Sequence, residues 1–226
     1  MANVLHGVRF PGESDEYREA RNELLRAELE LRERLEAVAA LRRTLPRGGA
    51  VENDYVFDEM GDDGRVRQTR LSALFAPGRD SLLLYSFMYG PAMAAACPMC
   101  TSFIDGMDAY APHITQRLGL AVVAKSPIER LRAWAVERRW RNVRLLSSAR
   151  NTYNADYFAE SADGQQLPAC NVFVRSGDTV AHFWAAELLY ASGAGHPRHV
   201  DLLWPIWSYF DLTPEGRGSW MPKLAY

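Results

Sequence analysis

Two cysteines stand three positions apart in the segment Cys97-Pro98-Met99-Cys100, and this spacing is the strongest chemical signal in the chain. Cysteines spaced in this way at the start of a helix can close a small disulfide ring. The backbone N–H groups of a helix start favour a thiolate, so Cys97 is expected to have a lowered pKa and to act as a nucleophile. Pro98 suits the first helical turn, where its missing N–H costs no hydrogen bond. The segment therefore predicts a catalytic thiol–disulfide site at Cys97 and Cys100.

The pair lies in an uncharged stretch, residues 81–104, which allows three other interpretations. A membrane span is excluded because Gly90-Pro91 divides the stretch into two pieces that are each too short to cross a bilayer. Two inert core cysteines are disfavoured because Cys-X-X-Cys between a strand and a helix is typical of redox proteins. A zinc site would need more ligands, yet Cys170 is the only other cysteine and the histidines lack finger spacing. No metal and no other cofactor are therefore expected; the histidines are His6, His113, His182, His196 and His199.

The segments around the cysteines alternate between strand and helix patterns. Apolar runs at residues 82–88 and 120–124 predict strands that are buried on both faces, and helical spacing follows each of them. This βαβ pattern implies a parallel sheet. Residues 167–174 and 179–184, joined by a turn at 175–178, predict an antiparallel edge. Residues 51–80 predict an entry hairpin and a short helix, and Pro205 is expected to kink or restart an aromatic-rich helix at 199–210.

Residues 14–45 predict one long helix with Ser14 as its N-cap. Most of its surface is charged with both signs, and its apolar stripe is narrow. Such a helix is not stable alone, so the stripe must lie on the domain that follows or on another subunit. A homodimer through this helix is therefore one of two possible arrangements. The residues that recur every seven positions are Tyr17, Leu24, Leu31, Val38 and Leu45.

Composition narrows the class of protein. The chain has 226 residues, of which 48% are hydrophobic, and a formal net charge of −2, so no overall basic field attracts nucleic acid or a membrane. The arginines among Trp134 and Trp140 are interpreted as a solvated helix face with tryptophans packed on the sheet. Three cysteines are too few for a secreted disulfide scaffold, and the first residues lack the apolar run of a signal peptide. A cytoplasmic location is expected, with a helical arm at 1–50, one domain at 51–212 and a tail at 213–226.

The order of these segments resembles the thioredoxin fold, a central mixed sheet flanked by helices. The resemblance rests on Cys97-Pro98-Met99-Cys100 after a core strand and on the segment from Pro168 to Val180, in which a proline precedes a strand that ends in Phe and a Gly-containing turn. Pro168 occupies the place of the cis-proline of thioredoxins. The resemblance implies an α/β, thioredoxin-like fold, a cis bond before Pro168 that keeps a backbone edge open to substrate, and substrate contacts at Pro168 and Pro98.

The sequence is similar, more specifically, to the bacterial thioredoxin-like family known as domain of unknown function 899. The stretches that carry this similarity are residues 85–91, 97–100, 126–130 and 211–217. The family implies a predicted dithiol–disulfide oxidoreductase without an assigned substrate. Two positions depart from related proteins: Ala96 precedes the pair where thioredoxins have Trp, and Ala94 stands where peroxiredoxins have Thr.

The residues and the resemblance lead to three functional hypotheses. In the first, Cys97 attacks a protein or small-molecule disulfide and Cys100 resolves the mixed disulfide. In the second, a thiol peroxidase, Cys97 becomes a sulfenic acid and Cys100 condenses with it. In the third, the fold is a non-catalytic binding or assembly module whose functional part is the long helix. Cys170 enters a buried strand and is interpreted as a core residue.

Overall fold

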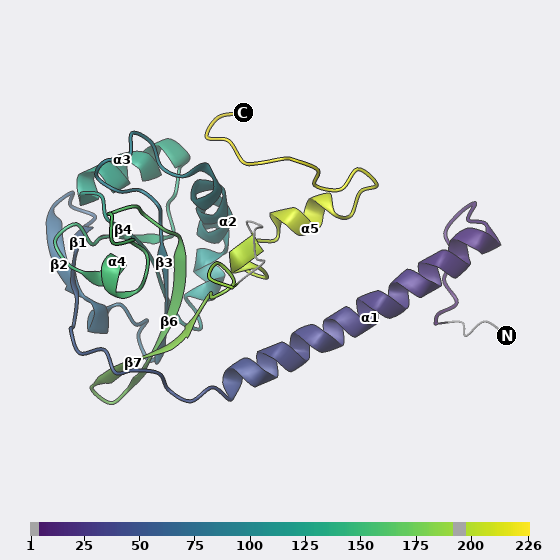
Figure 1. Cartoon of the computed structure of the whole chain (residues 1–226), viewed down its shortest axis with the longest axis horizontal. Helices are drawn as coiled ribbons and strands as arrows, with labels where there is room; N and C mark the ends of the chain where they lie inside the picture. The colour runs from purple at the N-terminus through teal and green to yellow at the C-terminus, as the bar shows by residue number, and fades with distance from the viewer. Residues whose placement is uncertain (1–4, 192–197) are drawn as a thin grey trace. The chain divides into compact units, whose positions relative to one another are not determined.

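A seven-stranded mixed sheet forms the centre of the computed structural model, which describes residues 5–191 and 198–226 (Figure 1). The strands are β1 (Val56–Met60), β2 (Val66–Arg70), β3 (Ser81–Ser86), β4 (Gly119–Ala124), β5 (Arg144–Ser147), β6 (Ala169–Ser176) and β7 (Thr179–Ala185). Their order in the sheet is β2-β1-β5-β4-β3-β6-β7. Strand β3 lies between a parallel neighbour, β4, and an antiparallel neighbour, β6. The predicted parallel unit with an antiparallel edge is therefore confirmed.

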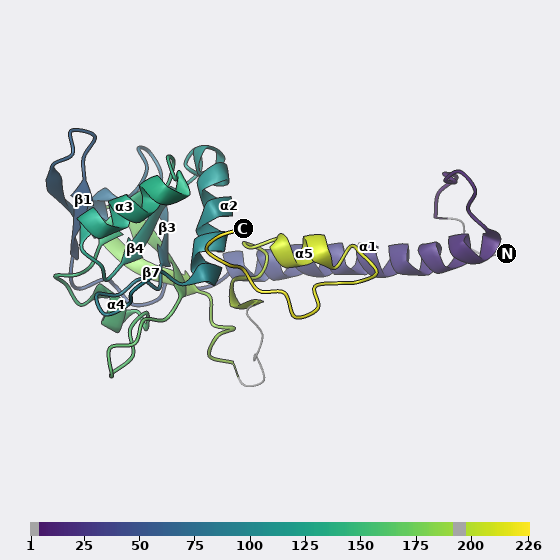
Figure 2. The same ribbon diagram turned by 90° about the horizontal axis from the view of Figure 1, so that it is seen from above.

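Helices cover both faces of this sheet. On one face lie α2 (Pro98–Ile114) and α3 (Ile128–Arg138), and on the other lie the single 3₁₀ turn η1 (Leu71–Ala73) and α4 (Tyr153–Asp156) (Figure 2). Alternation along β3 divides its side chains between two cores: Leu82 and Leu84 pack with η1 and α4, whereas Tyr85 packs with α2. Each fully buried leucine contributes about 2 kcal/mol through the area it removes from water. This is the thioredoxin-like α/β fold that the sequence predicts.

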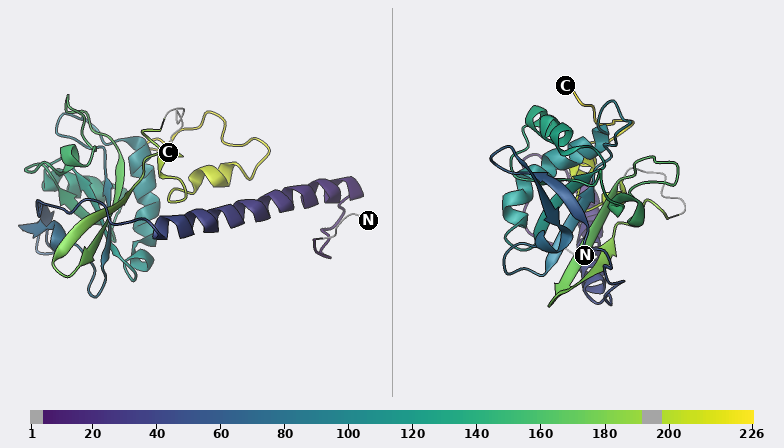
Figure 3. Two further views of the ribbon diagram at one scale, coloured as in Figure 1. Left: turned by 60° about the horizontal axis from the view of Figure 1, so that its bottom comes forward. Right: turned by 90° about the vertical axis from the view of Figure 1, so that its left-hand side faces the viewer.

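The segment after β7 packs on the same face as α2. It contains η2 (Arg198–Val200) and α5 (Ile206–Phe210), and Figure 3 shows α5 beyond α2, on the side away from the sheet. The ring of Trp204 is 6.1 Å from that of Phe103 in α2 and 5.1 Å from that of Trp207. Pro205 is the N-cap of α5, so the proline restarts the helix, which was one of the two predicted outcomes. Trp220 packs on Trp207 at 5.7 Å and so fixes the tail.

The chain divides into two compact units, residues 1–46 and 47–226. The first unit contains α1 (Asp15–Arg43), and the Ser14 hydroxyl caps it by accepting a hydrogen bond from the Tyr17 N–H at 3.1 Å. This confirms the predicted helix and its cap. Residues 1–46 do not cover the apolar stripe of α1, because Leu24 and Leu31 are 51% and 60% exposed. The expectation that a partner surface covers this stripe stays a prediction.

Strand β5 and the place of Arg144 differ from what the sequence predicts. Strand β5 was not anticipated, because it has four residues and begins at Arg144, which the sequence placed with the arginines of a helix face. The Arg144 guanidinium instead pairs with Glu59 of the neighbouring strand β1. In the tail, Trp220 packs on Trp207, whereas Tyr226 is 85% exposed. Within the described residues no helix combines the length and the apolar character that a bilayer crossing requires.

Candidate active site

The Cys-X-X-Cys segment begins α2 and is held at its first residue. Cys97 is the N-cap, with extended backbone angles, and Pro98 is the first helical residue, as the sequence predicts. The Cys97 N–H donates to the Met88 carbonyl oxygen at 3.1 Å, which ties the helix start to the segment just after β3. Because the first N–H groups of a helix have no partner within it, those of Met99 and Cys100 are free to donate to the Cys97 sulfur.

The two thiols of the pair lie in opposite environments. Cys97 is partly exposed, whereas Cys100, one turn into the helix, is 3% exposed. A hydrogen bond from the Cys100 thiol lowers the pKa of Cys97 to about 6, against the effect of partial burial, and the N–H groups of Cys100 and Met99 support the thiolate. Burial raises the pKa of Cys100 well above its usual range, and the hydrogen bond to Cys97 acts in the same direction. The pair therefore consists of one stable thiolate and one protonated thiol at neutral pH.

A small cavity of about 50 Å³ lies beside the pair. Its walls come from four segments that are distant in the sequence, and they are mostly apolar. Pro168 is part of the wall, so the structure brings it to the cysteines, whereas Pro98 is not. The peptide bond before Pro168 is trans, so the expected cis bond is wrong. The lining residues are Tyr85, Met88, Cys97, Met99, Cys100, Phe103, Pro168, His199, Val200 and Trp204.

Tyr85 is a polar residue of this wall that lies directly beneath the pair. Its ring packs edge-on against Phe103, with centroids 4.7 Å apart and planes inclined by 72°, and the residue is 1% exposed. Its hydroxyl hydrogen-bonds Cys100. Its partner in the adjacent strand β6 is Cys170, which is also 1% exposed. Burial raises the pKa of Cys170 to about 12, so this third thiol stays protonated in the core.

Arg130 of α3 fixes the loop that leads to Cys97. Its guanidinium donates to the carbonyl oxygens of Gly90, at 3.0 Å, of Ala94, at 3.3 Å, and of Met93. It also covers the Tyr89 ring, at 4.1 Å from the centroid. The charge of Arg130 is therefore directed at backbone oxygens of the loop, and the loop is anchored at several points before it reaches the nucleophile.

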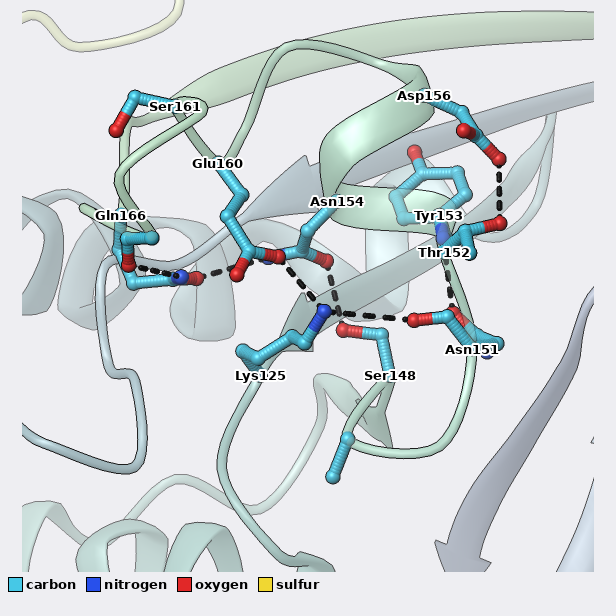
Figure 4. Close-up of polar contacts among 12 residues, drawn as sticks. Lys125, Ser148, Asn151, Thr152, Tyr153, Asn154, Asp156, Glu160, Ser161 and Gln166 are labelled. Atoms are coloured by element: carbon cyan, nitrogen blue, oxygen red, sulfur yellow. Dashed lines mark hydrogen bonds and ion pairs between the residues drawn. The ribbon is translucent and has the colours of Figure 1, made fainter.

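A polar network fixes the segment that ends at Pro168 (Figure 4). Lys125, which follows β4, pairs with Glu160 at 2.7 Å. The buried Asn154 accepts a hydrogen bond from Ser148 at 2.7 Å and donates to Gln166 at 3.0 Å. Gln166 in turn lies against Gly90, where an added Cβ would be 2.7 Å from its Cγ. The network therefore joins the loop before Cys97 to the residues just before Pro168.

Sequence reasoning identified the two cysteines and Pro168 but did not predict that Tyr85, His199 and Trp204 line the cavity. The position of Tyr85 could have been predicted from the sequence. Side chains alternate between the two faces of a strand, so Tyr85 lies on the same face as Phe87, towards the cysteine helix. His199 and Trp204 gave no such signal, because their place depends on how the segment after β7 folds back. Across residues 5–191 and 198–226, no three His, Cys, Asp or Glu side chains gather closely enough to hold a metal ion. His196, considered above as a zinc ligand, lies outside the described residues.

Comparison with known proteins adds a family and several structural likenesses. A protein family described as a bacterial protein of unknown function (DUF899) matches residues 8–225. No curated protein matches the sequence. Among solved structures, the reduced 2-Cys peroxiredoxin of Plasmodium vivax is similar with 14% identity and a TM-score of 0.46, over 62% of this chain and 81% of that chain. A reduced peroxiredoxin of Vibrio vulnificus, in complex with hydrogen peroxide, has 9% identity and a TM-score of 0.48, over 63% and 87% of the two chains. A peroxidoxin of Mycobacterium tuberculosis has 23% identity and a TM-score of 0.39, over 61% and 82%.

Proposed function

We propose that this chain, which belongs to the DUF899 family of bacterial proteins of unknown function, is a thiol–disulfide oxidoreductase. The observation that supports the proposal is the contrast within one Cys-X-X-Cys pair. Cys97 is partly exposed, with a pKa lowered to about 6 by the Cys100 thiol, and Cys100 is buried, with a raised pKa. A nucleophile has to be ionised and accessible, and a resolving thiol has to be protected until the first step has occurred.

The proposed reaction has two steps. The Cys97 thiolate attacks one sulfur of a substrate disulfide, a Cys97–substrate bond forms, and the other substrate sulfur leaves as a thiolate that takes a proton from water. Cys100 then loses its proton and attacks the Cys97 sulfur, which forms the Cys97–Cys100 disulfide and releases the second substrate sulfur as a thiol. The substrate disulfide gains two electrons and the protein dithiol loses two.

The substrate is proposed to be a protein or small-molecule disulfide, bound against the apolar wall beside Cys97. Pro168 supplies part of that wall, and a proline there leaves no N–H that would need a partner. Pro98 follows the nucleophile and is half-buried, so a group bound at Cys97 would meet it at the helix start. A cytoplasmic location, where thiols are kept reduced, would supply the dithiol form that the first step needs.

Disulfide reduction is favoured over peroxide reduction by the charges around the cavity. Within the described residues, no lysine or arginine lines it. The neighbouring Arg130 is occupied by three loop carbonyl groups, so it is not directed at the Cys97 sulfur. A peroxidase would need donors for the oxygen that leaves as Cys97 is oxidised to a sulfenic acid. Ala94, where peroxiredoxins have Thr, offers none from its side chain.

Parallel assays of insulin reduction and of peroxide consumption test the proposal. The wild-type protein is expected to reduce insulin, Cys97→Ser to lose the activity, and Cys170→Ser, which changes a buried thiol outside the pair, to retain it. Peroxide consumption without insulin reduction would assign a thiol peroxidase instead. If Cys97→Ser changes neither assay nor any phenotype of the cell, the non-catalytic module is the better hypothesis.

A further inference from the structure

We infer that Tyr85 is a catalytic residue of the second step, in which its hydroxyl stabilises Cys100 as a thiolate while Cys100 attacks the mixed disulfide at Cys97. This inference rests on the proposed use of the pair in thiol–disulfide exchange. It assigns a task to a residue that the sequence motif does not include.

The position of Tyr85 supports this role. The residue lies in β3, a strand paired on both sides, and its ring is held edge-on by Phe103 of α2, so the hydroxyl has a fixed place beneath the helix start. The hydroxyl hydrogen-bonds Cys100 and lines the same cavity as both cysteines. Because Tyr85 as a whole is 1% exposed, its hydroxyl needs a partner within the protein, and the Cys100 sulfur provides it.

The reaction itself creates the need for such a donor. In the resting dithiol the Cys100 proton is donated to the Cys97 thiolate, and burial and that charge both keep Cys100 protonated. Once Cys97 has entered a mixed disulfide, its sulfur is neutral and no longer attracts the proton. Cys100 must then become an anion in a largely apolar site, where an unpaired charge is costly. Two donors contact its sulfur, the Tyr85 hydroxyl and the Met88 N–H.

The second step balances in atoms and electrons, and Tyr85 neither gains nor loses a proton during it. The S–H bond of Cys100 breaks and its proton goes to water, the electron pair of the Cys100 sulfur forms the bond to Cys97, and the departing substrate sulfur leaves as a thiolate that can take a proton from water. The Cys97–substrate bond breaks as the substrate sulfur leaves. Burial raises the pKa of Tyr85 well above its usual range, so the hydroxyl remains a donor throughout and is not the base.

The two steps can be timed separately with dithiobis(nitrobenzoate), a coloured symmetric disulfide. Attack by Cys97 releases the first thionitrobenzoate, and resolution by Cys100 releases the second. In Tyr85→Phe, which keeps the ring against Phe103, the first release is expected at the wild-type rate. The second release is expected to slow by about tenfold, and its pH midpoint to rise by about one unit, since a hydrogen bond to a charged group is lost. Peptide mapping should show the label accumulating at Cys97.

Tyr153→Phe is the matched control, because Tyr153 is equally buried but packs in the core on the other face of the sheet. Its second release is expected at the wild-type rate. A wild-type rate of second release in Tyr85→Phe would overturn the inference, as would an equal slowing in Tyr153→Phe. The proposed function fails on a different result, namely wild-type protein that releases both equivalents but does not reduce insulin. Wild-type protein that releases only the first equivalent would overturn both.

Discussion

The replacement Cys100→Ala tests the cause of the acidity of Cys97. In the structure the hydrogen bond from the Cys100 thiol is the largest influence that lowers the pKa of Cys97, from its ordinary value of 9.0 to about 6. A hydrogen bond to a charged group is worth about 1.5–3 kcal/mol, and each pKa unit corresponds to about 1.4 kcal/mol. The loss of this donor should therefore raise the pKa of Cys97 by about one to two units. The pKa should not return to 9.0, because the N–H groups of Met99 and residue 100 remain.

The rate of alkylation of Cys97 by iodoacetamide as a function of pH measures this shift. Only the thiolate reacts, so the rate rises with pH through the pKa. The wild-type midpoint is expected at about 6. With a shift of one to two units, the thiolate fraction at neutral pH falls from about 90% to between about 50% and about 10%, so the rate should fall about two- to tenfold. Mass spectrometry of the peptide that contains Cys97 measures the alkylation of Cys97 separately from any alkylation of Cys170.

Cys100→Ser is the matched control, because its hydroxyl can still donate to the Cys97 thiolate. The midpoint is expected to move less in this variant than in Cys100→Ala. A midpoint that stays near 6 in Cys100→Ala would show that the helix start alone acidifies Cys97, and the reasoning would fail. It would also fail if Cys100 alkylates faster than Cys97 in the wild-type protein at neutral pH, because the two roles would then be reversed.

Three further predictions concern the surroundings of the pair. Arg130→Ala removes the donor to the loop carbonyl groups and should lower the free energy of unfolding in urea by about 2 kcal/mol, whereas the exposed Arg132→Ala should change it by less than about 0.5 kcal/mol. Air oxidation followed by non-reducing digestion should yield mainly the Cys97–Cys100 link, and a dominant link to Cys170 would contradict the assignment of that residue to the core. Deletion of residues 1–46 should lower either the oligomeric mass or the melting temperature, and no change in either would refute burial of the apolar stripe of α1.

The fold could be predicted from the sequence wherever a local pattern is strong. The uncharged run before Gly90 and the cysteine spacing place a buried strand, a loop and a helix start in order, because each is set by periodicity or by a residue with special backbone geometry. Strand β5 could not be found in this way, because four residues carry too little pattern and Arg144 obscures them. Its charge is accommodated only because Glu59 lies on the neighbouring strand, a contact across 85 residues.

The chemical difference between the two cysteines is only partly a property of the motif. The acidity of Cys97 follows from its place at the helix start and from Cys100 one turn later, and both are visible in the sequence. The burial of Cys100 is not visible there, because it depends on Tyr85 in β3, on Pro168 before β6 and on Trp204 after β7, which the fold brings together around one sulfur. In a Cys-X-X-Cys on an isolated helix in water, the first cysteine would still be acidic, but the second cysteine would not be buried. The protected resolving thiol is therefore a property of the tertiary structure, and the residues that enclose it are those whose replacement should separate the second step of the reaction from the first.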